Sequence, residues 1–352
     1  MKRNYSIDLI KTMAAFFVVA VHFLLNSGFY DQMIQTKLTF FWMMTRQVTI
    51  TAVPLFLLCT GFLMNRKKLS VSYLLNLFPV LFLYVSISLI GWLRMVVMGE
   101  GVSLVDALFG ILDYSTNTYS WYVEMYIGLY LMIPLLNLIW QANQNQFFHR
   151  YVVGVSLFLF FGPSLLNSFG KVVPDFWIEA YPIGYYFIGA YLFEYQEQFK
   201  KFKKTWLLLL IAIFTFFVLD VILDYQTTYQ DFAGNQYNGF EPLIISFLIF
   251  VCCLRITVPK GFQLPIRKLS QWTLGIYLMS DVTDQIVYPL ARIWLPTMEQ
   301  RLIYGFAIIL TSFSAAVLFS YPFERISEWL RRKLRSEQSV ERKDQHVSSK
   351  IH

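Results

Sequence analysis

The chain has 352 residues, of which 57% are apolar and only 14% are charged, whereas charged residues make up about 25% of an average soluble domain. Several apolar runs reach the roughly 20 residues that a helix needs to cross a bilayer. This composition excludes a soluble enzyme and predicts an all-α, polytopic membrane protein whose surroundings are the lipid bilayer.

The first apolar stretch, residues 7–25, carries three ionisable side chains, Asp8, Lys11 and His22. Such groups are costly inside a membrane, so they indicate function by default. Lys11 and His22 are eleven residues apart, which is about three helical turns, so they share one face about 16 Å apart along the axis. Asp8 lies one turn before Lys11 and can pair with it. The alternatives are that Asp8 and Lys11 extend to the headgroups, and that His22 is an interfacial or packing residue.

The hydropathy pattern predicts ten spans. Lys2 and Arg3 precede the first, and no small-residue cleavage site closes it, so we expect no removable signal peptide. The sixth and eighth spans are short. The predicted spans are 7–25, 44–64, 71–97, 120–140, 150–167, 180–194, 205–223, 242–257, 271–290 and 302–322.

The distribution of Lys and Arg predicts the orientation of these spans. If the N-terminus is cytoplasmic, the inner segments hold 22 Lys and Arg residues and the outer segments hold 6. We therefore expect both termini in the cytoplasm. The net charge of +7 is then mostly a signal of topology, and no nucleic-acid partner is expected. The basic clusters at 66–68 and 200–204 suit either the phosphates of a cytosolic donor or lipid headgroups.

Two later spans also carry polar side chains. Trp121 and Tyr122 open the fourth span as an aromatic belt, and Glu124 follows them as either a functional or an interfacial residue. The ninth span carries Ser280 and Asp281, with a second aspartate three residues further on. Charged groups at this depth face a bundle interior or water.

We expect spans one, four and nine to converge on a polar cavity that collects His22, Glu124 and Asp281. No Walker loop, GxSxG elbow, HExxH motif or Cys/His spacing typical of a metal site occurs in the sequence. We therefore expect no metal and no bound cofactor. The three cysteines fall within apolar runs, where burial as small hydrophobic residues is expected.

The remaining segments are loops and a tail. The outer segments 98–119 and 224–241 are rich in Tyr, Asn, Gln and Gly, which suits either carbohydrate hydroxyls or an ordinary solvated loop. We expect one transmembrane domain over residues 1–325. Residues 326–352 are expected to form a basic cytoplasmic tail that is partly disordered.

Four patterns, taken in order, resemble the acyltransferase-3 family of integral membrane acyltransferases over about residues 5–325. The first span has D-x-x-K-x10-H, formed by Asp8, Lys11 and His22. VPLFLLCTGFLM follows in the second span, SWYVEMYIGLYLMIPLL in the fourth, and LGIYLM and SYPFER in the last two. The chain departs from the family where Ser280 and Asp281 replace a frequent histidine, and where Ile50 replaces a frequent arginine.

The resemblance implies a ten-span enzyme of the bacterial plasma membrane. It would move an acyl group, usually acetyl from acetyl-CoA as co-substrate, onto a hydroxyl of an extracytoplasmic cell-envelope polysaccharide. It also implies that His22 is the essential histidine and that Lys11 occupies the position of the family's Arg or Lys. The resemblance does not extend to the other polar residues, but from their positions in the spans we expect supporting or substrate-binding roles for Asp8, Trp121, Tyr122, Glu124, Ser280 and Asp281.

If His22 is this essential histidine, it would act as a general base on the sugar hydroxyl, since an imidazole with an ordinary pKa of about 6.5 suits that role. A transient acyl-histidine is the other possibility. Lys11 would stabilise negative charge on the donor or pair with Asp8. Two other classes of function compete: a transporter of a small, amino-acid-like solute, and a non-catalytic partner in polysaccharide export.

Overall fold

The computed structural model of the protein describes residues 3–168, 170–230 and 232–348. Lys2, used in the topology argument, and residues 349–352 of the predicted tail lie outside this set. The described residues contain no β-strand, and the only extended pairings among them are two isolated bridges, Met33 with Thr228 and Ile34 with Tyr225. The predicted all-α class is therefore confirmed.

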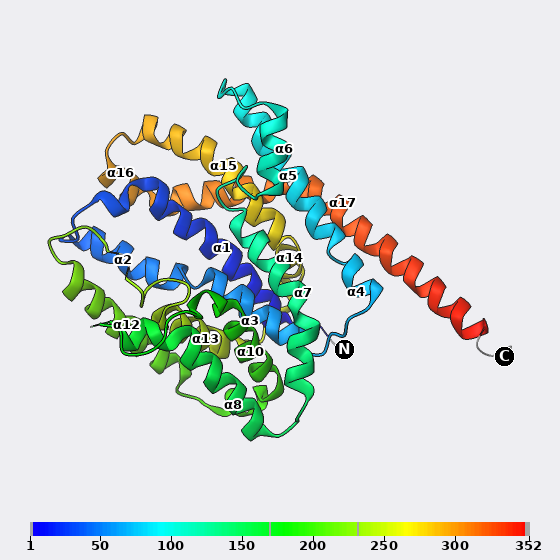
Figure 1. The fold of residues 1–352 in the computed structure, drawn as a ribbon. Helices are drawn as coiled ribbons and strands as arrows, with labels where there is room; N and C mark the ends of the chain where they lie inside the picture. Colours follow the sequence, from blue (N-terminus) through cyan, green and yellow to red (C-terminus); the bar gives the residue numbers. More distant parts are fainter. Residues whose placement is uncertain (1–2, 169, 231, 349–352) are drawn as a thin grey trace.

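Seventeen α-helices are defined in the described residues, and three short turns of 3-10 or π-helix, η1 (Phe29–Asp31), η2 (Leu157–Phe161) and η3 (Ile178–Ala180), join some of them (Figure 1). The helices are α1 (Tyr5–Ser27), α2 (Lys37–Thr49), α3 (Ala52–Met64), α4 (Val71–Leu75), α5 (Phe78–Val97), α6 (Leu104–Leu112), α7 (Trp121–Gln141), α8 (Gln146–Ser156), α9 (Gly162–Leu166), α10 (Tyr181–Glu194), α11 (Gln196–Lys201), α12 (Thr205–Asp224), α13 (Phe240–Leu254), α14 (Lys260–Gln271), α15 (Thr273–Trp294), α16 (Met298–Ile303) and α17 (Gly305–Ser348).

Within the described residues, seven helical stretches are long and apolar enough to cross a membrane, so the protein is a multi-pass membrane protein. They are Tyr5–Ser27, Lys37–Met64, Val71–Val97, Trp121–Gln141, Gln146–Leu166, Thr205–Asp224 and Gly305–Leu334. The other three predicted spans correspond to α10 and α13, which have only 14 and 15 residues, and to α15, whose middle is polar. The count of ten spans therefore remains a prediction.

Helix α3 lies at the centre of the bundle. Every residue from Ala52 to Phe62 is buried, as expected for a helix that is apolar on all sides. Helices α1, α10 and α13 pack around it, and α1 crosses the middle of the molecule in Figure 1. Helix α12, in contrast, is mostly exposed, as expected for a helix whose apolar side chains face lipid.

The contact between α3 and α10 depends on two glycines. A Cβ atom on Gly61 would collide with the carbonyl oxygen of Tyr186, and a Cβ on Gly189 would collide with the carbonyl oxygen of Leu58. Small residues let membrane helices approach closely enough for backbone packing. These glycines therefore set the distance between the two central helices.

Helix α1 begins and ends with clear capping signals. The side chain of Asn4 accepts a hydrogen bond from the backbone N–H of Ser6, which satisfies one of the free donors of the first turn. The helix ends at Gly28, whose φ of 86° lies in the left-handed region that favours glycine. Lys11 and His22 are thus held on one uninterrupted helix.

Segments far apart in the sequence are joined by hydrogen bonds at each end of the bundle. At the end that holds Arg3, the hydroxyl of Ser6 donates to the carbonyl of Ile256 and Arg255 donates to the carbonyl of Phe202. At the opposite end, Arg292 donates to the carbonyl of Asn26. Which end faces the cytoplasm remains a prediction based on charge.

The C-terminal helix α17 continues well past the last predicted span, to Ser348, and projects away from the bundle (Figure 1). The division into a transmembrane domain over residues 1–325 and a tail over residues 326–352 remains a prediction. The backbone shows one continuous helix across the proposed boundary.

We predict that Gly61→Ala lowers the stability of the protein by about 1–3 kcal/mol, because overpacking forces the central helices apart. The measurement is the Tm of the detergent-solubilised protein. Gly128→Ala in α7 is the matched control, since a Cβ there meets no atom within 4 Å and alanine favours a helix more than glycine. Equal Tm values for the two variants would contradict the close-packing account.

Candidate functional site

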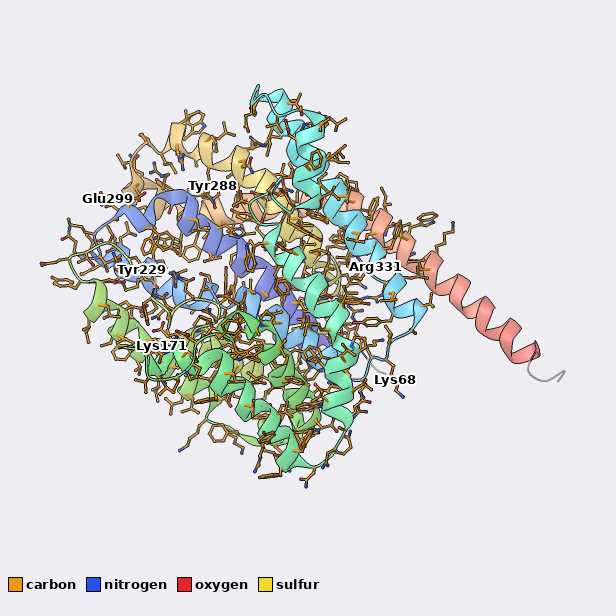
Figure 2. All side chains as sticks on the ribbon, viewed as in Figure 1. Lys68, Lys171, Tyr229, Tyr288, Glu299 and Arg331 are labelled. Carbon is orange, nitrogen blue, oxygen red and sulfur yellow. The ribbon has the colours of Figure 1, made fainter. Side chains whose placement is uncertain are left out.

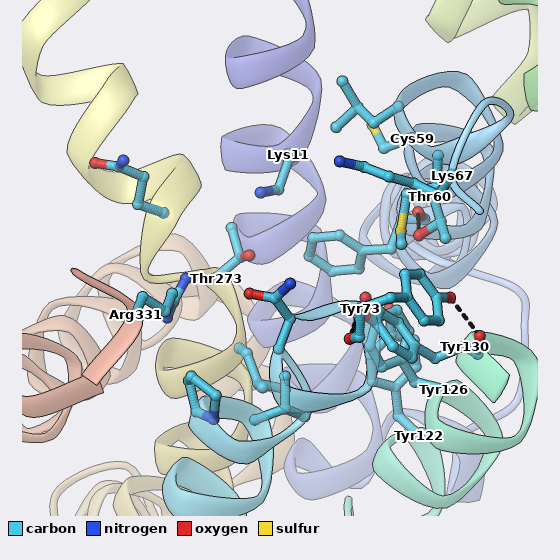
Figure 3. A pocket seen from close by; sticks show the side chains of 18 of the residues that line it. Lys11, Cys59, Thr60, Lys67, Tyr73, Tyr122, Tyr126, Tyr130, Thr273 and Arg331 are labelled. Carbon is cyan, nitrogen blue, oxygen red and sulfur yellow. Dashed lines mark hydrogen bonds between the residues drawn. The ribbon is translucent and has the colours of Figure 1, made fainter. Parts of the chain in front are cut away.

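A cavity of about 810 Å³ opens between α1, α3, α7, α15 and α17, with residues around α4 closing one side (Figure 3). This volume is within the range of small-molecule and cofactor sites. Its lining combines cations, hydroxyls, amides and tyrosines. The residues that line it are Lys11, Phe56, Cys59, Thr60, Leu63, Met64, Lys67, Lys68, Ser70, Ser72, Tyr73, Asn76, Pro79, Val80, Tyr122, Tyr126, Tyr130, Gln271, Thr273, Leu274, Tyr277 and Arg331.

Four cations line this cavity: Lys11, Lys67, Lys68 and Arg331. None of its lining residues is Asp or Glu. Lys67 and Lys68 are exposed in the segment after α3, so the cavity opens at this side of the bundle, where Figure 2 labels Lys68 and Arg331. Cations that gather in a concave site with no acidic side chain in its lining favour an anionic ligand.

Lys11 points into the cavity (Figure 3). It makes no hydrogen bond or ion pair with another side chain in the part of the chain that the structure describes. The predicted partner, Asp8, instead accepts from Arg3 Nε at 2.6 Å and from Ser270 Oγ at 2.8 Å. Its pairing with Lys11 was therefore not found, and Lys11 remains available to a ligand.

Tyrosines form one wall of the cavity. Tyr122, Tyr126 and Tyr130 follow one another at intervals of four residues and share one face of α7. Tyr73 stacks on Tyr130 with 4.4 Å between ring centroids, and each of the two hydroxyls donates to the backbone carbonyl of the other residue. At the far end, Tyr277 lies 5.1 Å from the ring of Tyr122. The wall is thus rigid, aromatic and weakly polar.

His22 lies in a separate buried cluster beyond this wall. Its imidazole stacks on Tyr119 with ring centroids 3.5 Å apart, and its Nδ1 lies 3.8 Å from Oδ2 of Asp284. Two hydroxyls fix that carboxylate, since Tyr119 donates to Oδ2 at 3.2 Å and Ser312 donates to Oδ1. No hydrogen-bond partner for Nδ1 of His22 occurs among the described residues.

One tyrosine connects the cavity with the His22 cluster. Tyr277 lines the cavity, its ring centroid is 6.2 Å from that of His22, and its hydroxyl donates to the carbonyl of Tyr119 at 2.8 Å. Lys11 faces the cavity and His22 faces the buried cluster on the same helix. The two polar residues of α1 therefore face different environments, and Tyr277 adjoins both.

The structure brings together only some of the predicted site residues. Tyr122 lines the cavity. The ring of Trp121 packs against the rings of Tyr122 and Tyr237. Glu124 is exposed and does not line the cavity. The expectation that it joins His22 is therefore wrong, because its position on α7 turns it away from α1.

The ninth-span residues Ser280 and Asp281 are both buried on α15, and their roles in the site remain a prediction. The Ser280 hydroxyl donates to the carbonyl of Tyr277, and Asp281 accepts from Gln285 at 3.1 Å. The acidic partner of His22 is Asp284 instead. The sequence contains part of the information needed to predict this contact, since the helical spacing of Tyr277, Asp281 and Asp284 places them on one face of the helix.

Two other residues of the His22 cluster, Tyr119 and Ser312, could not be predicted from the sequence. Tyr119 precedes α7, where an aromatic residue is expected at a membrane interface. Ser312 lies between two other hydroxyl residues, Thr311 and Ser314, in an otherwise apolar stretch of α17. Neither residue can be assigned to His22 without knowing how the helices pack.

A second buried polar cluster lies at the opposite end of the bundle from Lys68, around Arg46 of α2. Its guanidinium donates from Nε to the hydroxyl of Tyr30 and lies 4.6 Å from the ring centroid of Tyr229. It also interacts electrostatically with the buried carboxylates of Asp220 and Glu241. This cluster fastens the segment between α12 and α13 to the bundle.

Neither cluster has the composition of a metal centre. Within the ranges that the structure describes, no group of three or more His, Cys, Asp or Glu side chains is arranged to hold a metal ion. The three cysteines, Cys59, Cys252 and Cys253, are buried and free, as expected.

Comparison with known proteins gives one match. A family model described as "Acyltransferase domain" matches residues 4–321, nearly the whole chain. No curated protein and no solved structure matches the chain.

We predict that Arg46→Leu lowers the stability by on the order of 3 kcal/mol, because removing one member of a buried charge group leaves the others uncompensated. The Tm of the solubilised protein measures this loss. Arg292→Leu is the control, since Arg292 is an exposed arginine at the same end of the bundle. A Tm for Arg46→Leu equal to that of the control would show that Arg46 does not stabilise the cluster.

Proposed function

Because the chain belongs to the acyltransferase-3 family, whose members are membrane acyltransferases, we propose that it moves an acyl group from cytosolic acyl-CoA to a hydroxyl of an extracytoplasmic carbohydrate. Acetyl is the proposed acyl group, and a polysaccharide of a bacterial cell envelope is the proposed acceptor. The observation that carries this proposal is the cavity with four cations, which ends one tyrosine away from a buried histidine.

The cation-lined part of the cavity suits the donor. Acyl-CoA carries several negative charges on its nucleotide and a long, flexible thioester arm. Lys11, Lys67, Lys68 and Arg331 would bind the phosphates, because charge-assisted hydrogen bonds to phosphate are strong. The arm would lie along the tyrosine wall, which presents aromatic faces and a few hydroxyls. The proposed topology places this end of the bundle in the cytosol.

His22 and Asp284 suit the transfer step. In the general-base route, the imidazole takes the proton of the acceptor hydroxyl while the oxygen attacks the thioester carbonyl. The C–S bond then breaks, and the imidazolium returns the proton to the departing thiolate. Asp284, 3.8 Å from Nδ1, would stabilise the imidazolium. Such a base contributes typically about 10²–10⁴ in rate.

A transient acyl-histidine is the second route for the same residues. The imidazole nitrogen would attack the thioester itself, release the thiol and later pass the acyl group to the hydroxyl. The two routes differ in whether a labelled acyl group remains on the protein when the acceptor is absent. Peptide mass spectrometry around His22 after incubation with acetyl-CoA distinguishes them.

We predict that His22→Ala abolishes acylation of the host's surface polysaccharide and that Asp284→Asn causes a smaller loss. Each variant is expressed in a deletion strain, and NMR of the purified polymer reports the ester signals while immunoblots report membrane levels. Glu299→Gln is the control, because Glu299 is an exposed acid on α16, near the end opposite Lys68 in Figure 2.

The outcomes separate the proposals. An ester that depends on the gene and on His22 supports the enzyme, and the missing signal identifies both sugar and acyl group. An ester pattern that never depends on the gene would contradict the proposed substrate. Full activity of His22→Ala at normal membrane levels would remove His22 from the mechanism.

A further inference from the structure

The C-terminal helix brings one arginine into the cavity from outside the segment that the family model matches. The match ends at residue 321, whereas Arg331 lines the cavity from two to three helical turns further along α17. Figure 3 shows its side chain pointing toward Thr273 and the space next to Lys11. Its neighbour Arg332 points elsewhere and pairs with Glu328, and its side chain is 74% exposed.

Two contacts hold Arg331 in this position. Its Nη2 donates to Ser327 Oγ at 2.9 Å and to Glu324 Oε2 at 3.3 Å. Glu324 is fully buried, and its other oxygen accepts from the backbone N–H of Gly275 at 2.9 Å. The guanidinium is thus oriented by a carboxylate that is itself fixed to the start of α15.

This anchoring does not use all the donors of Arg331. A guanidinium has five N–H groups in a rigid fork, and both contacts involve Nη2. Neither contact uses the two N–H groups of Nη1. Arg331 can therefore hold Glu324 through Nη2 and still donate to a ligand in the cavity through Nη1.

A purely structural role for Arg331 explains why it pairs with Glu324, but it does not explain why Lys11 and Arg331 line the same cavity. Arg331 and Lys11 repel each other electrostatically, although both line a cavity without a single acidic lining residue. Glu324 and Asp8, which do not line the cavity, offset part of this repulsion. A phosphate bound between Lys11 and Arg331 would offset the rest.

We propose that Arg331 is a phosphate-binding residue of the donor site, so that the cytoplasmic extension of α17 completes the nucleotide end of the cavity. This inference rests on the proposed use of acyl-CoA. Lys11 and Arg331 would contact the same phosphate group from α1 and α17, with Glu324 as the positioning residue. The nucleotide then occupies the cationic end, and the thioester arm points toward Tyr277.

We predict that Arg331→Ala weakens binding of CoA about 10–100-fold, as expected for the loss of hydrogen bonds between charged groups. Binding is measured by isothermal titration of the full chain in nanodiscs with CoA and, separately, with pantetheine, which lacks phosphates. Pantetheine should bind Arg331→Ala and the wild type equally. Arg331→Lys should recover part of the CoA affinity, because it keeps the charge but loses the planar fork.

Two controls distinguish ligand binding from structural support. Arg332→Ala removes the adjacent cation, which does not line the cavity, and should leave CoA affinity unchanged. Glu324→Gln removes the carboxylate but keeps Arg331, so it should weaken CoA binding far less than Arg331→Ala.

Three results would overturn the inference. If Arg331→Ala lowers CoA and pantetheine affinity by the same factor, Arg331 supports the fold of the cavity and does not bind phosphate. If Arg331→Ala binds CoA as well as the wild type does, Arg331 is not in the donor site. If the wild type itself does not bind CoA, the proposed donor fails together with the inference.

Discussion

The structure depends on one constraint, which is that ionisable side chains inside a hydrocarbon layer must be enclosed by protein. Helix α1 carries Lys11 and His22, and both would be costly against lipid. The molecule surrounds this helix with α3, α13, α14, α15 and α17. The burial of α3 and the close contact between Gly61 and Gly189 help to enclose these side chains. A looser bundle would admit lipid or bulk water to the same groups.

The enclosed polar groups are divided into two environments with different chemistry. Around Lys11 the side chains are cations, amides and hydroxyls that face an open cavity. Around His22 they are a carboxylate, two hydroxyls and stacked rings in a packed interior. The first environment suits binding of a large charged molecule, and the second suits control of one proton. Lys11 and His22, one from each set, lie on the same continuous helix, so the separation of the two environments is fixed.

The sequence predicted those features that depend on composition or on the period of one helix. The all-α class, the polytopic character and the shared face of Lys11 and His22 follow from hydropathy and from 3.6 residues per turn. The partner of Asp8 was not predictable in this way, because Arg3 and Lys11 are both within reach in sequence, and only the structure shows that Asp8 pairs with Arg3 and accepts from Ser270 of α14. Glu124 and Asp284 show the same difficulty, since the rotation of α7 and α15 about their axes decides which acid meets His22.

The number of membrane crossings shows where hydropathy alone is insufficient. Helices α10 and α13 are too short to span a bilayer by themselves, and α15 is too polar, yet all three are largely buried against other helices. A helix shielded by neighbours does not need the apolar length of one that faces lipid. Arg331 was not predictable either. It lies on α17 beyond the last predicted span, and nothing in the sequence indicates that its side chain lines the cavity.

The single layer formed by Tyr277 has an electrical consequence. When the cationic end of the cavity is open to the cytosol, water and ions fill the cavity, and the electrical potential at the ring of Tyr277 equals that of the cytosol. The transmembrane voltage then falls over the part of the protein beyond this ring, and a unit charge crossing the whole voltage changes in energy by about 2.3 kcal/mol per 100 mV. If the donor binds as proposed, the phosphates of its nucleotide stay on the inner side of this step, and only a neutral acyl group has to pass it. Tyr277 would then separate the path of the acyl group from a path for ions.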